Sequence, residues 1–161
     1  MSNYGSVYEH SPWIAERAFD AGLTAEADAP DGLSALLRAQ VEAADEAAQL
    51  ALLRAHPNLA GKLAMTGKLT KASTAEQAGV GLDACSAQEF ERFQALNKAY
   101  VERFGFPFIL AIADRQRSKI LENFESRVDN DLDAEFREAL DQVHRIALLR
   151  LQTLTQEISN P

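Results

Sequence analysis

The sequence contains a single cysteine among its 161 residues, Cys85, so no disulfide can form within the chain. It has no Cys-x-x-Cys pair, and its three histidines, His10, His56 and His144, are too widely spaced to suggest a zinc site. A chain of this length buries about 70% of the surface that its unfolded form exposes, so it needs neither kind of cross-link to fold. We therefore expect no metal and a reduced, intracellular setting, the cytoplasm.

Basic residues and long apolar runs are also scarce. There are 16 Lys and Arg against 24 Asp and Glu, giving a net charge of −8, which argues against nucleic acid as a partner. The longest uncharged stretch, residues 104–113, is about half of the ~18 apolar residues that a membrane-spanning helix needs. The first residues show no basic start followed by an apolar run. We therefore expect no membrane segment and no export signal.

Apolar residues recur three and four positions apart through most of the chain, which predicts amphipathic helices. Ser11-Pro12 is typical of an N-cap followed by proline at the first helical position, and Gly22 is expected to end that short helix. Two further helices are predicted between Gly32 and His56, separated by an acidic break at Asp45-Glu46.

The second half of the chain gives the longer predicted helices. An aromatic stripe over residues 90–104 is preceded by the capping box Ser86-x-x-Glu89 and followed by Gly105. A short helix around Ile120 and a long one over residues 131–158 complete the pattern. The sequence thus predicts an all-α, single-domain bundle of seven or eight helices over residues 1–161. Residues 106–112 could instead be a strand, but a single strand cannot form a sheet, so we expect a buried extended or helical segment.

His56 is the first candidate for chemistry. It precedes Pro57 and is expected near the end of a helix, because a residue before proline is displaced from helical geometry. The negative end of the helix dipole favours a protonated imidazole, which suits proton transfer near neutral pH. Capping of the helix end is a purely structural alternative.

Ser73, Glu76 and Gln77 form the second candidate group. The spacing Ser73-x-x-Glu76 is typical of a capping box, which would explain both residues without a function. The free N–H groups of a helix N-terminus could also attract an anionic substrate.

The third candidate is the apolar run FGFPFILAIA, residues 104–113. A continuous apolar run is usually part of the core. Because Pro107 interrupts regular pairing, however, nearby amides and carbonyls are candidates to bind the amide groups of a ligand.

In this order, the three segments resemble the OHCU decarboxylase family, whose members act on 2-oxo-4-hydroxy-4-carboxy-5-ureidoimidazoline in urate breakdown. The resemblance rests on HPNLAGKLA from His56, S-x-x-EQ from Ser73, and F-x-x-LN-x-x-Y-x-x-RFGFPFI ending at Ile109. It spans about residues 10–158. No single motif is decisive, but the three together form a fairly specific signature.

The resemblance implies a role for each matching residue. His56 would be the catalytic acid, and Pro57 would line the pocket. Ser73, Glu76 and Gln77 would contact the substrate, and we expect Glu76 to hold the imidazole or the ureido N–H groups. Main-chain groups would complete the site in Phe108, Ile109, Leu110, Ala111 and Ile112. The family also implies an all-helical homodimer that forms (S)-allantoin from its small-molecule substrate without a metal or organic cofactor. Asn58 and Ala113-Asp114 depart from the residues common in the family.

Two other functions stay open at this level. The aromatic stripe could make the protein a non-catalytic helical module that binds a partner. Alternatively, the same pocket could serve a related lyase or hydrolase of ureido compounds. An enzyme needs His56 within reach of Glu76, whereas a binding module does not.

Overall fold

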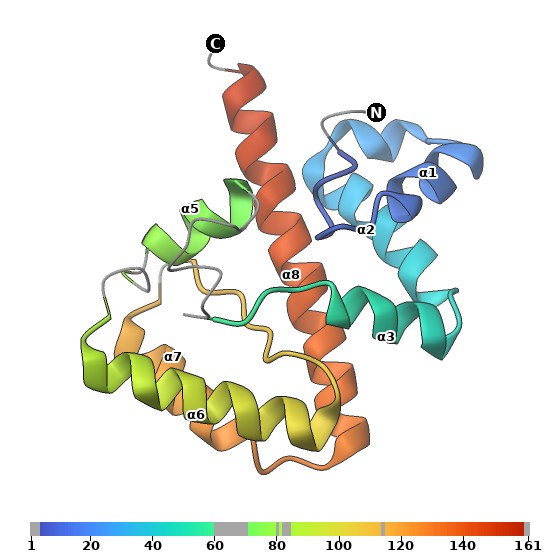
Figure 1. The fold of residues 1–161 in the computed structure, drawn as a ribbon. Helices are drawn as coiled ribbons and strands as arrows, with labels where there is room; N and C mark the ends of the chain where they lie inside the picture. Colours follow the sequence, from blue (N-terminus) through green and yellow to red (C-terminus); the bar gives the residue numbers. More distant parts are fainter. Residues whose placement is uncertain (1–3, 60–70, 80, 82–84, 114, 160–161) are drawn as a thin grey trace.

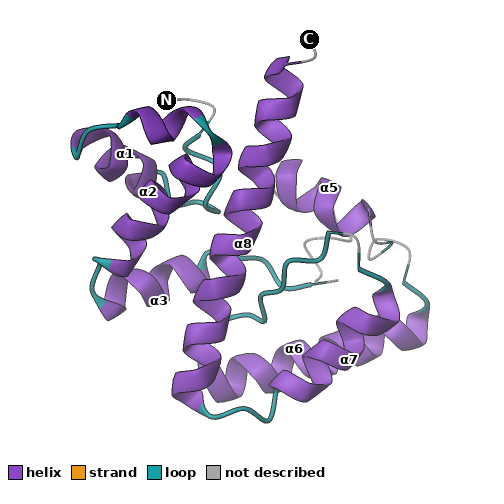
Figure 2. Ribbon diagram, turned by 180° about the vertical axis from the view of Figure 1, so that it is seen from behind, coloured by secondary structure: helices purple, strands orange, loops and turns teal. Residues whose placement is uncertain are grey.

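The computed structural model describes residues 4–59, 71–79, 81, 85–113 and 115–159. Within these ranges the chain forms seven α-helices, one 3₁₀ helix and no strand, so the prediction of an all-α fold is confirmed (Figure 2). The elements are α1 (Trp13–Asp20), η1 (Ala25–Asp28), α2 (Pro30–Glu42), α3 (Glu46–Arg54), α5 (Lys71–Gly79), α6 (Ala87–Phe104), α7 (Arg117–Arg127) and α8 (Leu132–Ser159).

The long helix α8 runs through the middle of the molecule, with α1–α3 on one side and α5–α7 on the other (Figures 1 and 2). Its observed range is within one residue of the predicted one at each end. One face of α8 is buried along most of its length, with Ala139, Leu140, Val143, Ala147 and Leu151 in the core. This helix therefore holds the two groups of shorter helices together.

The predicted ends of α3 and α6 are confirmed. The Asp45 side chain accepts a hydrogen bond from the Ala48 amide at the start of α3. Ser86 and Glu89 form the expected reciprocal capping box of α6. Gly105 ends that helix in the left-handed conformation, at φ 78°, which glycine adopts without strain.

Two predicted helix starts are wrong. Helix α1 begins after Pro12 and has no side-chain cap, because the Ser11 hydroxyl donates to the Glu9 carbonyl instead. Ser73 is the third residue of α5 and so cannot be its N-cap. Long-range polar contacts engage both Ser73 and Glu76, as described below.

Residues 106–112 form neither helix nor strand and are buried. The Phe108 ring stacks on Phe124 of α7, with centroids 3.9 Å apart and planes inclined by 13°. Irregular backbone thus passes through the aromatic core, in keeping with the expectation of a buried segment outside any sheet.

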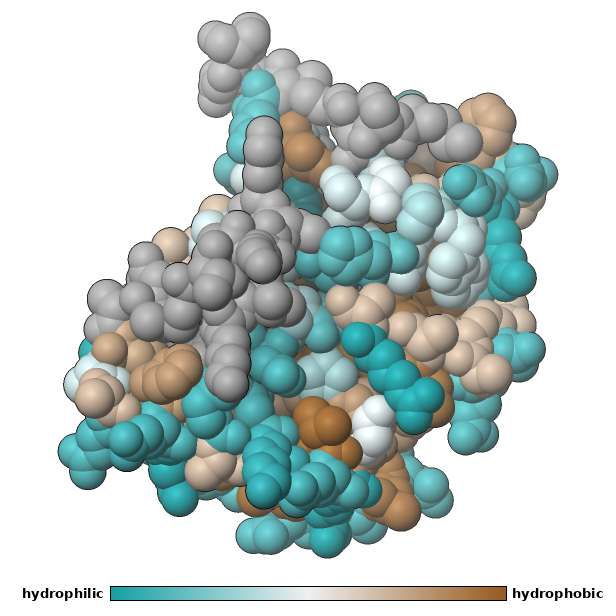
Figure 3. Space-filling view, in the orientation of Figure 1, coloured by the Kyte–Doolittle hydropathy of each residue, from teal (hydrophilic) through white to brown (hydrophobic). Residues whose placement is uncertain are grey.

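The described helices include none that combines the length and apolar character needed to cross a membrane. On the face that Figure 3 shows, hydrophilic and hydrophobic residues are interspersed.

Candidate active site

His56 lies just after α3 and is 8% exposed. Its Nδ1 is 3.3 Å from the Leu52 carbonyl oxygen. Because a carbonyl can only accept, Nδ1 carries the proton in this contact, and in the neutral imidazole Nε2 then keeps the lone pair.

Burial lowers the pKa of His56 to about 4, and this outweighs the hydrogen bond to Leu52 and the nearby Glu9 carboxylate, both of which raise it. The imidazole is therefore neutral at pH 7. The expectation that the end of the helix would favour a protonated His56 is wrong, because loss of hydration disfavours the charge more than the helix end stabilises it.

A cavity of about 30 Å³ lies beside His56. It brings together nearly all of the predicted site residues, namely His56, Pro57, Ser73, Glu76, Gln77, Phe108, Ile109, Leu110 and Ile112. Leu59, Ile146 and Arg150 complete its lining. Ala111 is the predicted site residue that does not line it. Residues 60–64 of the first motif and Asp114 lie outside the described residues.

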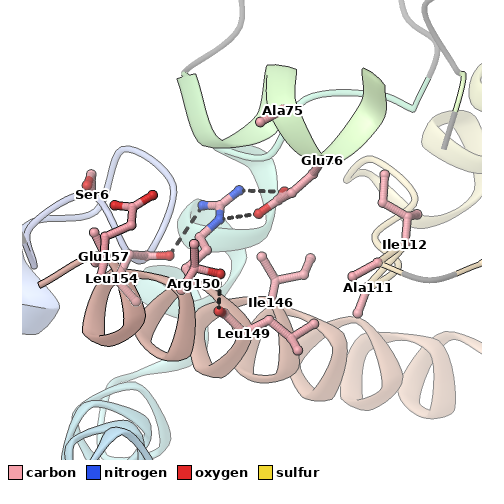
Figure 4. Close-up of a pocket in the computed structure, with 13 residues that line it drawn as sticks. Ser6, Ala75, Glu76, Ala111, Ile112, Ile146, Leu149, Arg150, Leu154 and Glu157 are labelled. Atoms are coloured by element: carbon pink, nitrogen blue, oxygen red, sulfur yellow. Dashed lines mark hydrogen bonds and ion pairs between the residues drawn. The ribbon is translucent and has the colours of Figure 1, made fainter. Parts of the chain in front are cut away.

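Arg150 of α8 connects the polar groups around this cavity. Its Nε and Nη2 atoms lie 2.6 Å and 2.9 Å from the two carboxylate oxygens of Glu76 on α5 (Figure 4). Its Nη1 donates to Glu9 at 2.9 Å. Burial would lower the pKa of Arg150, but the contacts with Glu76 and Glu9 raise it above its ordinary value. Arg150 therefore remains charged.

Ser73 and Glu9 belong to the same cluster of hydrogen-bonded side chains as Arg150 and Glu76. The Ser73 hydroxyl donates to Glu9 Oε2 at 2.9 Å and lies 3.2 Å from Nη2 of Arg150. The Glu9 side chain is 1% exposed. A buried carboxylate is costly unless it is paired, and here the Ser73 hydroxyl and the Arg150 guanidinium both bond to it.

A second cavity of about 610 Å³ adjoins the first. The two share the lining residues Glu76, Ile112, Ile146 and Arg150. In Figure 4, Arg150 rises from α8 to meet Glu76, which descends from α5. The Glu76–Arg150 pair therefore stands at the boundary between a small cavity with the histidine and a larger one of ligand size.

Sequence reasoning missed Arg150 and Glu9. Arg150 follows Ala147 by three positions and precedes Leu151, so a charge on the apolar face of α8 was the available signal. Glu9 lies outside any helix and gives no such pattern. Among the described residues, no group of three His, Cys, Asp or Glu side chains is arranged to hold a metal ion.

Comparison with known proteins gives a consistent picture. The family model described as OHCU decarboxylase matches residues 1–152. The 2-oxo-4-hydroxy-4-carboxy-5-ureidoimidazoline decarboxylase of Haloferax volcanii is 47% identical over 92% of this chain and 84% of its own. The mouse (Mus musculus) protein of the same name is 35% identical over 94% of this chain and 83% of its own. The uric acid degradation bifunctional protein PucL of Bacillus subtilis is 39% identical over 95% of this chain, but that match covers only 30% of the longer protein.

Two solved structures share the fold. A crystal structure of (S)-allantoin synthase superposes with a TM-score of 0.72 and 32% identity over 94% of this chain. The chain spans about half of that protein, since the match covers 48% of it. An OHCU decarboxylase crystallised in the presence of (S)-allantoin has a TM-score of 0.71 at 18% identity, over 94% of this chain and 96% of its own.

Proposed function

Because this chain belongs to the OHCU decarboxylase family, we propose that it converts 2-oxo-4-hydroxy-4-carboxy-5-ureidoimidazoline to (S)-allantoin in urate catabolism, without a metal or an organic cofactor. The observation that carries this proposal is that His56 and Glu76 line one small cavity, beside residues 108–110.

The chemistry of the substrate explains why no cofactor is needed to take up the electron pair that decarboxylation releases. Its carboxylate sits on a ring carbon next to a C=N unit. When the bond to the carboxylate breaks, carbon dioxide leaves and the electron pair passes into that unit. The protein then has to orient the carboxylate out of the ring plane, exclude water and deliver a proton to one face of the ring.

His56 is the group for proton transfer. In its neutral form, Nε2 can accept the proton of the ring hydroxyl as that oxygen becomes a carbonyl. The resulting imidazolium returns the proton to the ring carbon that bears the ureido group, while solvent supplies the proton that the ring nitrogen takes up. The Leu52 carbonyl holds the imidazole in one tautomer and orientation during this exchange.

Glu76 and Arg150 bind and orient the substrate in this proposal, together with Ser73 and Gln77. The cavity of about 30 Å³ holds little more than a water molecule, so the substrate must enlarge it. Moving the Glu76–Arg150 pair would join it to the larger cavity on the other side. The substrate carboxylate can then approach Arg150, and its ureido N–H groups can donate to Glu76.

The test is to incubate the protein with freshly generated hydrolysis product of hydroxyisourate and to follow the optical activity of the allantoin formed. The proposal predicts rapid formation of the (S) enantiomer. Racemic allantoin at the uncatalysed rate would contradict it and would favour a non-catalytic helical module. Further breakdown of allantoin would instead indicate a lyase or hydrolase of ureido compounds.

We also propose that residues 1–161 form one domain and that the protein works as a homodimer in the cytoplasm. The resemblance to the family supports the dimer, and the lone Cys85 fits a reducing compartment. Sedimentation equilibrium at micromolar concentration tests the dimer, which predicts twice the chain mass of 17.7 kDa. Fractionation of source cells tests the location.

A further inference from the structure

Residues 109–112 lack the regular backbone hydrogen bonds of a helix or sheet, but side chains from α7, from α8 and from the loop before α7 bond to main-chain groups of this segment. The Arg127 Nη1 atom donates to the Ile109 carbonyl at 2.8 Å. Gln142 Oε1 accepts from the Ala111 amide at 2.9 Å. Arg115 Nε donates to the Ala111 carbonyl at 2.9 Å. We call Arg127, Gln142 and Arg115 the anchor residues.

Each of these contacts fixes one peptide plane. Among the described residues all peptide bonds are trans, and in a planar trans peptide the C=O and the next N–H point in opposite directions. With the Ile109 carbonyl turned to its anchor, the Leu110 N–H points the other way. The same geometry turns the Leu110 carbonyl away from Gln142, and the Ile112 N–H away from Arg115.

The groups that point away from the anchor residues belong to residues that line the small cavity. Leu110 and Ile112 are part of its lining, whereas Ala111 and the three anchor residues are not. The segment thus turns a donor, an acceptor and a second donor away from the anchor residues. Planar amide and ureido groups carry N–H donors beside carbonyl acceptors and can pair with such a series.

We propose that the anchor residues are positioning residues, which hold residues 109–112 so that the main chain of Leu110 and Ile112 binds the amide and ureido groups of the substrate. This inference rests on the proposed function, and it adds three residues that touch no substrate. It also implies that the N–H and C=O of Ala111 do not bind the substrate, because Gln142 and Arg115 already bond to them.

The surroundings of Arg127 support a positioning role. Its Nε donates to Glu135 at 2.9 Å, and its guanidinium lies 4.5 Å from the centre of the Phe108 ring. Glu135 is fully buried and also accepts from Tyr100 and Asn130. A buried ion pair often adds little net stability compared with apolar residues of the same volume. Here the Arg127–Glu135 pair holds the planar guanidinium against the Ile109 carbonyl, and two apolar residues could not do so.

Gln142 gives the sharpest test because it is half-buried and lines neither cavity described above. Gln142→Met removes the acceptor for the Ala111 amide while keeping similar volume. We expect KM to rise about five- to tenfold, with kcat close to that of the parent and a melting temperature lowered by a few degrees, because the buried Ala111 amide loses its acceptor. Gln152→Met changes a half-buried glutamine on the same helix and should leave KM unchanged.

Exchanging the residues at positions 138 and 142 distinguishes a positioning role of Gln142 from a general effect on packing. The Gln142 amide donates to Glu138 at 2.8 Å, so Gln142→Glu combined with Glu138→Gln keeps both hydrogen bonds. The double variant should restore the parent KM. A parent KM in Gln142→Met, or a raised KM in a stable swapped variant, would overturn the proposal.

Arg127→Lys provides a second test of the positioning role, because lysine keeps the charge but cannot bond Ile109 and Glu135 with one planar group. In the parent, adding (S)-allantoin should shift the amide resonances of Leu110 and Ile112, and the shift should be smaller in folded Arg127→Lys. Unchanged shifts in this variant would contradict the inference. Failure of the proposed function is a different result, namely that the parent itself forms no (S)-allantoin.

Discussion

Arg150 and Glu76 face each other across two hydrogen bonds, of 2.6 Å and 2.9 Å, that join α8 to α5. Both side chains line the small cavity of His56 and the larger cavity beside it. The pair is therefore both a structural link between the two helices and a part of the wall of each cavity.

His56→Asn should reduce kcat by about 10² to 10⁴, the usual contribution of a positioned proton-transfer group. Asparagine is polar and similar in size, so the melting temperature should change little. Steady-state kinetics and thermal unfolding measure the two effects. The control is His10→Asn, at a side chain that is 67% exposed, which should keep the parent kcat. A folded His56→Asn variant with the parent rate would remove the histidine from the mechanism.

Glu76→Gln should lower kcat/KM about ten- to a hundredfold, because it removes a charged acceptor that is assigned to the substrate. The amide has nearly the same shape, so the change is mainly one of charge. Glu125→Gln is a suitable control, since that carboxylate also pairs with an arginine but lies on the surface and lines neither cavity. If kcat and KM both stayed at parent values, Glu76 would have no more than a structural role.

Ser86→Ala and Ser73→Ala should have contrasting effects, although both serines begin a Ser-x-x-Glu sequence. Ser86→Ala removes the N-cap of α6 and should cost about 1 kcal/mol of unfolding free energy without a change in kcat/KM. Ser73→Ala removes contacts with Glu9 and Arg150 and should lower kcat/KM. Urea unfolding and kinetics on both variants check this. Equal kinetic effects would show that Ser73 has no special place in the site.

The unfolding free energy should fall as the pH drops from about 6.5 to about 4. Burial lowers the pKa of His56 and of His144 to about 4, whereas the unfolded chain protonates histidine near 6.5. Between these values the unfolded state binds more protons, so stability is lost on acidification, by on the order of 3 kcal/mol per histidine. Urea unfolding at neutral and acidic pH measures the loss. It should be smaller in His56→Asn, and an equal loss would mean that His56 contributes nothing to it.

Periodicity located α8 to within one residue, because apolar spacing depends on the helix itself and not on distant partners. His144 lies on this helix and is buried, with Nδ1 accepting from the Tyr8 hydroxyl and Nε2 donating to Glu42.

The two Ser-x-x-Glu sequences show where local reasoning fails. Ser86 caps α6 because the chain enters the helix there, whereas α5 already begins at Lys71 and carries Ser73 inside it. The Ser73 hydroxyl and the Glu76 carboxylate instead contact Arg150, which lies 77 and 74 positions away in the sequence. No local pattern encodes such a pairing. The one available signal was an arginine placed on an apolar helix face.

The protonation state of His56 was mispredicted for a related reason. The end of a helix is visible in the sequence, and it does favour a charged imidazole. The extent of burial is not visible, because it depends on how segments from α5, α8 and residues 108–112 close over the ring. Similarly, the sequence indicated that the main chain after Pro107 could meet a ligand, but the direction of each peptide depends on anchor residues far along the chain.

Helix α5 is held in an unusual way. Of its side chains that the structure describes, the buried ones are Ser73 and Gln77, both polar, and its firmest link to α8 is the Glu76–Arg150 pair. Arg150 is 8% exposed and Glu76 is 28% exposed, and dissolved ions screen such a largely buried pair much less than a surface pair. The attachment of α5 to α8 should therefore persist at high ionic strength, under conditions that weaken the ion pairs on the outside of the molecule.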